Sequence, residues 1–105
     1  MRPYASLRRT AEFSRLRQRG RRVNANALTI YRSDPQAADR TSVVGITVAK
    51  PVGGAVVRNK VRRRVAAILR DLLAGRRMRL LVVARPPAAQ APFSQLRNEL
   101  ERALV

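Results

Sequence analysis

The chain has 105 residues, and its 23 Lys and Arg residues against 6 Asp and Glu give a formal net charge of +17. Its hydrophobic content of 46% is typical of a folded chain, so we expect one domain over residues 1–105. The positive charges repel one another, and we expect contact with a polyanion to relieve this repulsion. Cysteine and histidine are absent, which excludes disulfides, thiol nucleophiles, typical zinc sites and the usual general base.

The first half of the chain predicts a helix and two strands. Residues 1–9 are basic and are expected to be mobile. A short amphipathic helix is expected over residues 10–19, and β-branched and small residues predict a strand over 23–31. Residues 33–40 form a polar loop, and strict alternation of apolar residues predicts a second strand over 41–50. We therefore expect the loop to join these two strands as a hairpin.

The second half predicts a long helix, a central strand and a final helix. The helix begins after Gly54 and runs to about Ala74, and its apolar residues form a single stripe: Val57, Val61, Val65, Ile68, Leu69 and Leu72. Residues 78–84 are nearly continuously apolar, which is typical of a strand covered on both faces. A last helix is expected from about Ser94. This order of elements predicts an α+β sandwich around one layered core.

The segment 50–64 is the most distinctive part of the sequence, because it opens the long helix with closely spaced cations. Lys50 precedes two glycines, and the first helical turns then carry Arg58, Lys60, Arg62, Arg63 and Arg64. Such cations repel one another unless a polyanion or free water lies beside them. On a helical wheel Asn59, Arg63 and Arg70 lie opposite the apolar stripe, and Arg58 and Arg62 flank it. The motif therefore predicts an exposed surface that contacts phosphates.

The remaining residue types do not form an enzyme site. The carboxylates are scattered over expected helices and a loop, without the pair at strand ends that a two-metal nuclease needs: Glu12, Asp34, Asp39, Asp71, Glu99 and Glu101. Gly53 and Gly54 are not followed by the Gly-Lys-Ser/Thr of a phosphate-binding loop. We expect no catalytic residue and no metal ligand in the protein. Phe13 and Tyr31 have two interpretations, packing in the core and stacking on bases of a single strand.

The run from Gly53 to Arg63 resembles the hallmark of the protein subunit of bacterial ribonuclease P. That hallmark is a strand ending in basic residues and then Gly-Asn-Ala-Val-x-Arg-Asn-Arg-x-(Lys/Arg)-Arg at the start of a long helix. Further similarities lie in Glu12-Phe13 with Gly20, in residues 28–31, and in residues 82–85 followed by an alanine. The sequence departs from the pattern at Gly54 and Lys60, where the family usually has Asn and Arg.

The resemblance implies a compact two-layer αβββαβα sandwich with a left-handed βαβ crossover. It also implies a function: the protein component of a ribonucleoprotein that removes the 5′ leader from precursor tRNA. The partners implied are the catalytic RNA, which does the chemistry and holds most of the Mg²⁺, and the precursor tRNA, with the protein monomeric in the complex. The residues implied to face the catalytic RNA are Arg58, Asn59, Lys60, Arg62 and Arg63, with Lys50 before them.

The resemblance further implies a cleft between the sheet and the first helix that binds the single-stranded leader. Its candidate residues are Phe13, Tyr31 and Arg85. The family often has a second aromatic residue one turn after the first, where this sequence has Arg17, so the contact is expected to be more electrostatic here.

Two alternatives share the size, the charge and the absence of catalytic groups. The first is a small ribosomal protein that binds ribosomal RNA, but this class does not explain the ordered motif. The second is a DNA-binding protein, but no short turn links two helices as in a helix-turn-helix domain. The N-terminus has no apolar segment of signal-peptide type, and no apolar run is long enough to span a membrane, so we expect a cytoplasmic protein.

Overall fold

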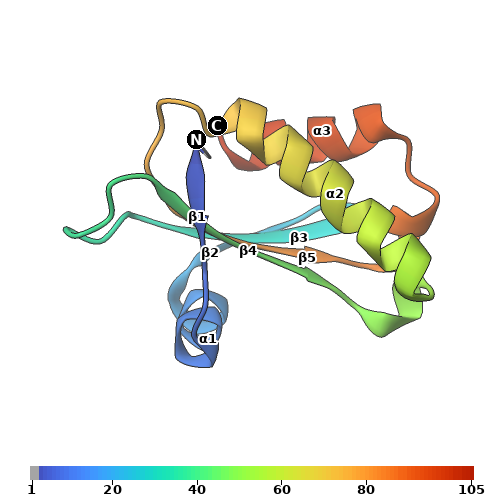
Figure 1. Cartoon of the computed structure of the whole chain (residues 1–105), viewed down its shortest axis with the longest axis horizontal. Coiled ribbons are helices and arrows are strands. Elements are labelled where there is room, and N and C mark those ends of the chain that lie inside the picture. The colour runs from blue at the N-terminus through green and yellow to red at the C-terminus, as the bar shows by residue number, and fades with distance from the viewer. Residues whose placement is uncertain (1–2) are drawn as a thin grey trace.

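The computed structural model describes residues 3–105 as an α+β fold in which three helices pack on one mixed sheet (Figure 1). The strands are β1 (Tyr4–Ser6), β2 (Arg21–Asn24), β3 (Leu28–Ser33), β4 (Ser42–Val48) and β5 (Arg79–Ala84). The helices are α1 (Thr10–Arg19), α2 (Ala55–Leu72) and α3 (Phe93–Ala103), with short 3₁₀ turns η1 (Lys50–Val52) and η2 (Pro86–Ala89). None of these helices is both long and apolar enough to cross a membrane.

The five strands are arranged in the order β1-β4-β5-β3-β2. The pairs β1·β4 and β4·β5 are parallel, and the pairs β3·β5 and β2·β3 are antiparallel. β5 is the central strand, and Leu80, Leu81 and Val82 are fully buried because helices cover both faces of the sheet. The prediction of a central strand from the apolar run 78–84 is confirmed.

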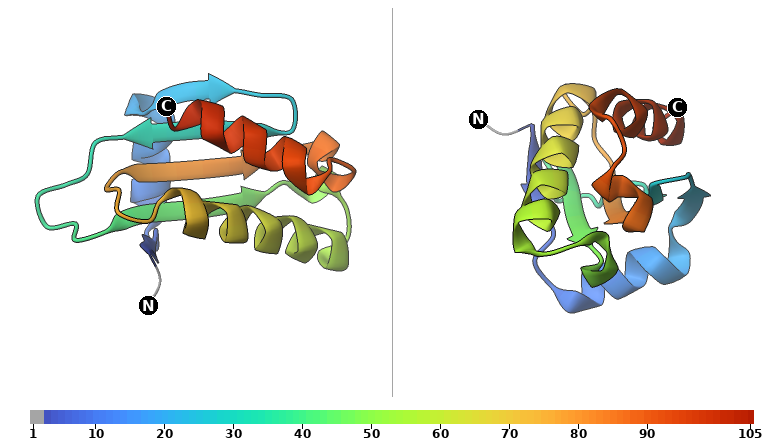
Figure 2. Two further views of the ribbon diagram at one scale, coloured as in Figure 1. Left: turned by 90° about the horizontal axis from the view of Figure 1, so that it is seen from above. Right: turned by 90° about the vertical axis from the view of Figure 1, so that its right-hand side faces the viewer.

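The helices lie on both faces of the sheet, so the sandwich has three layers and the predicted two-layer arrangement is wrong. Figures 1 and 2 show α2 and α3 side by side over one face and α1 under the other. The face under α2 and α3 carries the larger hydrophobic cluster. The face over α1 carries a smaller cluster built around Leu7, Leu16 and Leu81. α1 is therefore held by a few contacts rather than by the main core.

α2 follows the predicted apolar stripe and fixes the orientation of the motif. Val61, Val65, Ile68 and Leu69 are at most 2% exposed. The helix ends before Gly75, whose φ of +74° lies in the left-handed region that a side chain disfavours. The prediction of a helix that stops at this glycine is confirmed.

Three local predictions differ from the structure. Residues 1–9 were expected to be mobile, but Tyr4–Ser6 forms a strand beside β4, because Tyr4 and Leu7 are both buried; the first two residues lie outside those described. The expected strand over 23–31 is two antiparallel strands, since a turn separates Asn24 from Leu28. β3 and β4 do not form a hairpin, because β5 lies between them.

Candidate RNA interface

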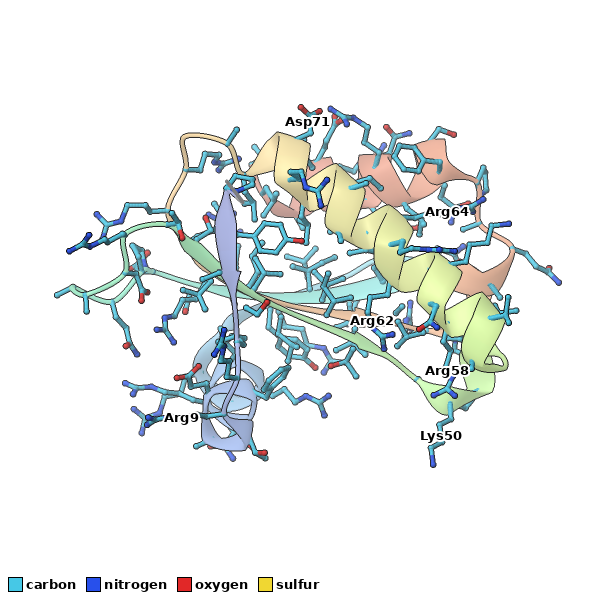
Figure 3. The ribbon with its side chains drawn as sticks, viewed as in Figure 1. Arg9, Lys50, Arg58, Arg62, Arg64 and Asp71 are labelled. Carbon is cyan, nitrogen blue, oxygen red and sulfur yellow. The ribbon has the colours of Figure 1, made fainter. Side chains whose placement is uncertain are left out.

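The motif cations lie along the exposed flank of the N-terminal half of α2. The buried stripe points Val61 and Val65 into the core, so the residues between them turn outward. Figure 3 shows Lys50, Arg58 and Arg62 along the lower flank of α2, with Arg64 on its upper side. Arg58 is half-buried, and the other predicted RNA-facing residues are exposed: Lys50, Asn59, Lys60, Arg62 and Arg63.

The motif keeps its positive charge free of acidic partners. Within residues 3–105 the ion pairs involve only Arg79 and Arg97 among the cations, and neither belongs to the motif. Nη1 of Arg62 donates to Oδ1 of Asn59 at 3.1 Å, which holds two motif side chains together without neutralising charge. The buried Nε of Arg58 has no hydrogen-bond partner among the residues that the structure describes. The motif surface is thus a donor-rich cationic surface suited to phosphate oxygens.

A groove of about 310 Å³ runs beside the motif between α1 and α2. We call it the edge groove. Phe13 of α1 lines it on one side and Arg62 of α2 on the other, so two residues predicted for different RNA contacts lie in one hollow. The lining residues come from four elements and the segment after β1: Tyr4, Ser6, Leu7, Phe13, Val44, Gly45, Ile46, Arg62, Ala66 and Arg70.

The floor of the edge groove is an unpaired part of β4. β1 pairs only with Ser42 to Val44, and no other described strand lies on that side. The carbonyl of Val44 accepts from the N–H of Leu7 at 2.9 Å. The N–H and C=O of Ile46, two residues further along the strand, point to the same side but lie beyond the end of β1. The groove therefore presents backbone donors and acceptors as well as an aromatic ring and two guanidinium groups.

The other leader-binding candidates lie outside the edge groove. Arg17 is exposed on α1, one turn after Phe13. Tyr31 is half-buried in the cluster under the sheet, and its ring lies 5.9 Å from the guanidinium carbon of Arg22. The structure therefore brings Phe13 and Arg62 to one groove, whereas Tyr31 shares the small hydrophobic cluster with Phe13 but does not line the groove.

Arg85 and Glu99 together fix the turn between β2 and β3. Nη2 of Arg85 donates to the carbonyls of Ala25 and Asn26. The carboxylate of Glu99 on α3 accepts from the N–H groups of Ala27 and Leu28 at 3.0 Å each. One cation thus satisfies the carbonyls of the turn and one anion satisfies its N–H groups. Nη2 of Arg85 is thus engaged by the turn, and Arg85 does not line the edge groove.

Five carboxylates bind partners within the protein (Glu12, Asp39, Asp71, Glu99 and Glu101), and those of residues 3–105 do not gather into a metal site. Asp39 binds Arg79 through both oxygens, at 2.8 and 3.0 Å, and Glu12 lies 3.9 Å from the same guanidinium. These hydrogen bonds from Arg79 hold the pKa of Asp39 below its usual value, and the carboxylate raises the pKa of Arg79. Over residues 3–105 no group of three or more acidic, cysteine or histidine residues fits a metal ion.

Comparisons with known proteins identify the family of the chain. The family model described as Ribonuclease P matches residues 1–105. The chain is 40% identical to the ribonuclease P protein component of Acidothermus cellulolyticus, over 93% of this chain and 83% of that protein. It is 39% identical to that of Streptomyces avermitilis, over 93% and 87% of the two chains. The chain belongs to the bacterial ribonuclease P protein component family.

Solved structures of this family have the same fold. The Staphylococcus aureus RNase P protein superposes with a TM-score of 0.83 at 27% identity, over 94% of this chain and 91% of that one. The protein is therefore a subunit of ribonuclease P, the ribonucleoprotein endoribonuclease that processes the 5′ end of tRNA. The predicted family and function are confirmed, and the ribosomal-protein alternative is not supported.

Several residues that line the edge groove of this ribonuclease P protein were not predicted from its sequence. Ala66 and Arg70 follow Arg62 at intervals of four residues, so the three share one flank of α2. The helical wheel had placed Arg70 opposite the apolar stripe, which hid this relation. The i, i+4, i+8 spacing was the signal that could have found it. Gly45 and Leu7 carried no comparable signal, since their part depends on how β1 and α1 meet β4.

Proposed function

We propose that the edge groove binds the single-stranded 5′ leader of precursor tRNA and that the motif surface contacts the catalytic RNA. The supporting observation is that Phe13 and Arg62 line the same groove, at the point where the motif flank of α2 meets α1. An aromatic ring supplies a stacking surface for a base, and a guanidinium supplies charge for a phosphate. These are the two contacts that a single-stranded nucleic acid requires.

The groove has the chemistry of recognition without sequence preference. Phe13 stacks on one base, because every base has an aromatic face. Arg62 and Arg70 neutralise the phosphates on the α2 side, and Arg17 adds charge one turn beyond Phe13. The backbone groups of Ile46 offer hydrogen bonds that any nucleotide can use. Since Arg17, Tyr31 and Arg85 do not line the groove, the leader contacts proposed within it are Phe13, Arg62 and Arg70, with Arg17 one turn beyond Phe13.

On the motif surface we propose that the exposed cations contact phosphates of the catalytic RNA. Asn59 provides both a donor and an acceptor there, and its bond to Arg62 orients the pair. Lys50, at the start of η1, extends the surface beyond the N-terminus of α2. The residues proposed for this contact are Lys50, Arg58, Asn59, Lys60, Arg62 and Arg63.

We propose that the Mg²⁺ of the holoenzyme is held mainly by the RNA subunit. The acidic side chains do not fit a metal cluster, because Asp39 and Glu12 face Arg79 and Glu99 binds backbone N–H groups. No side chain of the protein is assigned a catalytic role. The protein screens repulsion between two polyanions, which lowers the Mg²⁺ concentration that the ribonucleoprotein needs.

The test uses the reconstituted complex. Bacterial ribonuclease P RNA and leader-bearing precursor tRNA are mixed at low Mg²⁺, with and without the protein. We expect the protein to rescue cleavage at the mature 5′ end and to cleave nothing without the RNA. Rescue that fails at every Mg²⁺ concentration, or specific cleavage by nuclease-free protein alone, would contradict the proposal.

The groove is tested by comparing two phenylalanines. We expect Phe13→Ala to weaken binding of precursor tRNA by roughly 1–3 kcal/mol, the scale of one stacked base, and to leave binding of mature tRNA unchanged. Phe93→Ala is the matched control, because Phe93 lies on α3 and is 43% exposed but does not line the groove. Equal losses for precursor and mature tRNA would return Phe13 to a purely structural role.

Three finer features stay predictions. They are the left-handed βαβ crossover of β4, α2 and β5, a single protein copy per complex, and a cytoplasmic location.

A further inference from the structure

Gly45 lies in β4 directly against the ring of Phe13. A Cβ placed on Gly45 would stand 2.6 Å from Cε1 of Phe13 and 3.0 Å from its Cζ. It would also stand 3.0 Å from Cδ1 of Leu7. Ordinary contacts of a Cβ begin at about 3.4 Å, so any other residue at this position would displace one or both of these side chains. The glycine leaves the space that the ring occupies.

The type of atom that crowds Gly45 decides the consequence of filling that space. All three crowding atoms belong to side chains rather than to the backbone. At Gly20, by contrast, a Cβ would stand 2.5 Å from the carbonyl oxygen of Leu16 and 3.2 Å from that of Arg32, both in the backbone. An added Cβ at position 20 would therefore press on backbone atoms, whereas one at position 45 would press on the Phe13 ring and on Leu7.

We propose that Gly45 is a positioning residue for leader binding: its missing side chain seats the Phe13 ring against β4 and thereby sets the depth of the edge groove. The inference rests on the proposed function of that groove. To reach ordinary contact, the nearest ring atom must retreat by about 0.8 Å from an added Cβ, away from β4. That movement carries the ring toward the space that a nucleotide would fill, since Phe13 and Gly45 both line the groove.

The contact between Gly45 and the Phe13 ring also couples the N-terminal segment to the groove. Leu7 follows β1, is buried at 6% exposure, and donates its N–H to the carbonyl of Val44 beside Gly45. Its side chain shares with Phe13 the space that the glycine leaves open. The position of the ring therefore depends jointly on β1, α1 and β4, although β4 is far from the other two elements in the sequence.

The test measures dissociation constants of the reconstituted ribonucleoprotein for precursor and mature tRNA. We expect Gly45→Ala to weaken binding of precursor tRNA about five- to tenfold and to leave binding of mature tRNA unchanged. A loss of this size is part of the loss expected when one stacked base is removed. In a Phe13→Ala background, adding Gly45→Ala should have no further effect, because no ring remains to be displaced. Unchanged precursor binding by folded Gly45→Ala, or a full additional loss in the Phe13→Ala background, would overturn the proposal.

Gly75→Ala controls for a general loss of stability. Position 75 has open space around it but a φ of +74°, so an alanine there strains the turn after α2 without touching the groove. We expect it to lower the melting temperature and to leave the ratio of precursor to mature binding as in the natural protein. An equal drop of that ratio in Gly75→Ala and Gly45→Ala would attribute the effect to stability and refute positioning.

A second readout needs no RNA. Nuclear Overhauser contacts between the Hα protons of Gly45 and the ring protons of Phe13 should be present in the natural protein. If Gly45→Ala does not fold, the double variant with Phe13→Ala should fold again, because the crowding ring is gone. If these contacts were absent, or if the double variant stayed unfolded, the proposed packing of the Phe13 ring against Gly45 would be refuted. If the natural protein does not distinguish precursor from mature tRNA, the proposal of leader binding fails. The nuclear Overhauser contacts and the folding of the double variant still decide whether Phe13 packs against Gly45.

Discussion

The arginines around α3 and the arginines on the motif flank of α2 are used in opposite ways. Near α3 they bond to the protein itself: Arg32 donates to the carbonyl of Ala103 at 2.9 Å, and Arg76 to that of Leu104 at 2.6 Å. On the motif flank, the one partner of Arg62 within residues 3–105 is the neutral Asn59, and Arg63 is exposed. Of the 23 cations 21 are arginine, and those bonded within the protein are not available to contact RNA.

The difference shows that not every positive side chain of a basic protein is available to bind RNA. A guanidinium has five N–H donors in a planar fork, so it can satisfy carbonyls at a helix end as well as phosphates. Positive side chains at the C-terminus of α3 also complement the negative end of the helix dipole. The partner inside the fold, rather than the residue type, decides which arginines are available to RNA.

Removing a structural arginine should have the largest effect on stability. Arg79 is 12% exposed and binds Asp39, which is 9% exposed, through two hydrogen bonds. We expect Arg79→Ala to lower the free energy of unfolding by about 3 kcal/mol, because it leaves a nearly buried carboxylate without its partner. Denaturant unfolding measures this loss, and Arg79→Lys should recover part of it. An unchanged midpoint would place Arg79 with the surface arginines.

The same pair should give the protein an acid-sensitive step. Arg79 lowers the pKa of Asp39 in the folded state, so the pair stabilises the fold fully above the unfolded pKa near 3.8 and less as pH falls through the folded value. We expect Asp39→Asn to be less stable than the natural protein at neutral pH and to lose less stability below pH 4. Thermal melts from pH 7 to pH 2 measure the difference. Parallel melting curves for the two proteins would contradict the assignment.

Removing a motif arginine should affect RNA binding and leave the fold intact. We expect Arg62→Ala to weaken affinity for the catalytic RNA several-fold and to reduce the slope of log affinity against log salt by about 0.7–0.9. Its melting temperature should stay unchanged, since Arg62 is exposed and bonds only Asn59. Titrations at several salt concentrations test this. Arg62→Lys should keep the salt slope, and an intact slope in Arg62→Ala would contradict the motif assignment.

The smallest effect is expected at Arg97, which pairs internally but at the surface. It donates to Asp71 at 2.7 Å and to Glu101 at 2.8 Å, and its side chain is 36% exposed. We expect Arg97→Ala to change stability very little and to leave RNA affinity and its salt slope unchanged, because water screens an exposed ion pair. Unfolding and binding titrations on the same sample check both. A reduced salt slope would show that an internally paired arginine also contacts RNA.

The sequence predicted the elements whose pattern is carried by their own residues. The apolar stripe from Val57 to Leu72 placed α2 and its exposed motif, and the apolar run 78–84 placed β5 at the centre of the sheet. Phe13 and Arg62 were both predicted as RNA contacts, and the structure brings them to one groove. In these cases local periodicity and side-chain chemistry contain the information.

The features that sequence reasoning missed depend on distant partners. The turn between β2 and β3 contains no glycine or proline, and Arg85 and Glu99 hold it from outside. β1 has only three residues, too few for a period, and exists because it pairs with β4. The role of Gly45 requires β1, α1 and β4 to be in place first.

The short length of β1 has a consequence for the protein before it meets RNA. A strand edge that ends its pairing at Val44 and stays open at Ile46 is a template for strands of other chains, and such edges promote aggregation. Arg62 and Arg70 beside this edge act as charged gatekeepers, and the repulsion between two copies of +17 adds to them. High salt removes this protection, so the free chain should be most soluble at low ionic strength and, once bound, should be shielded by the nucleic acid that covers its open edge.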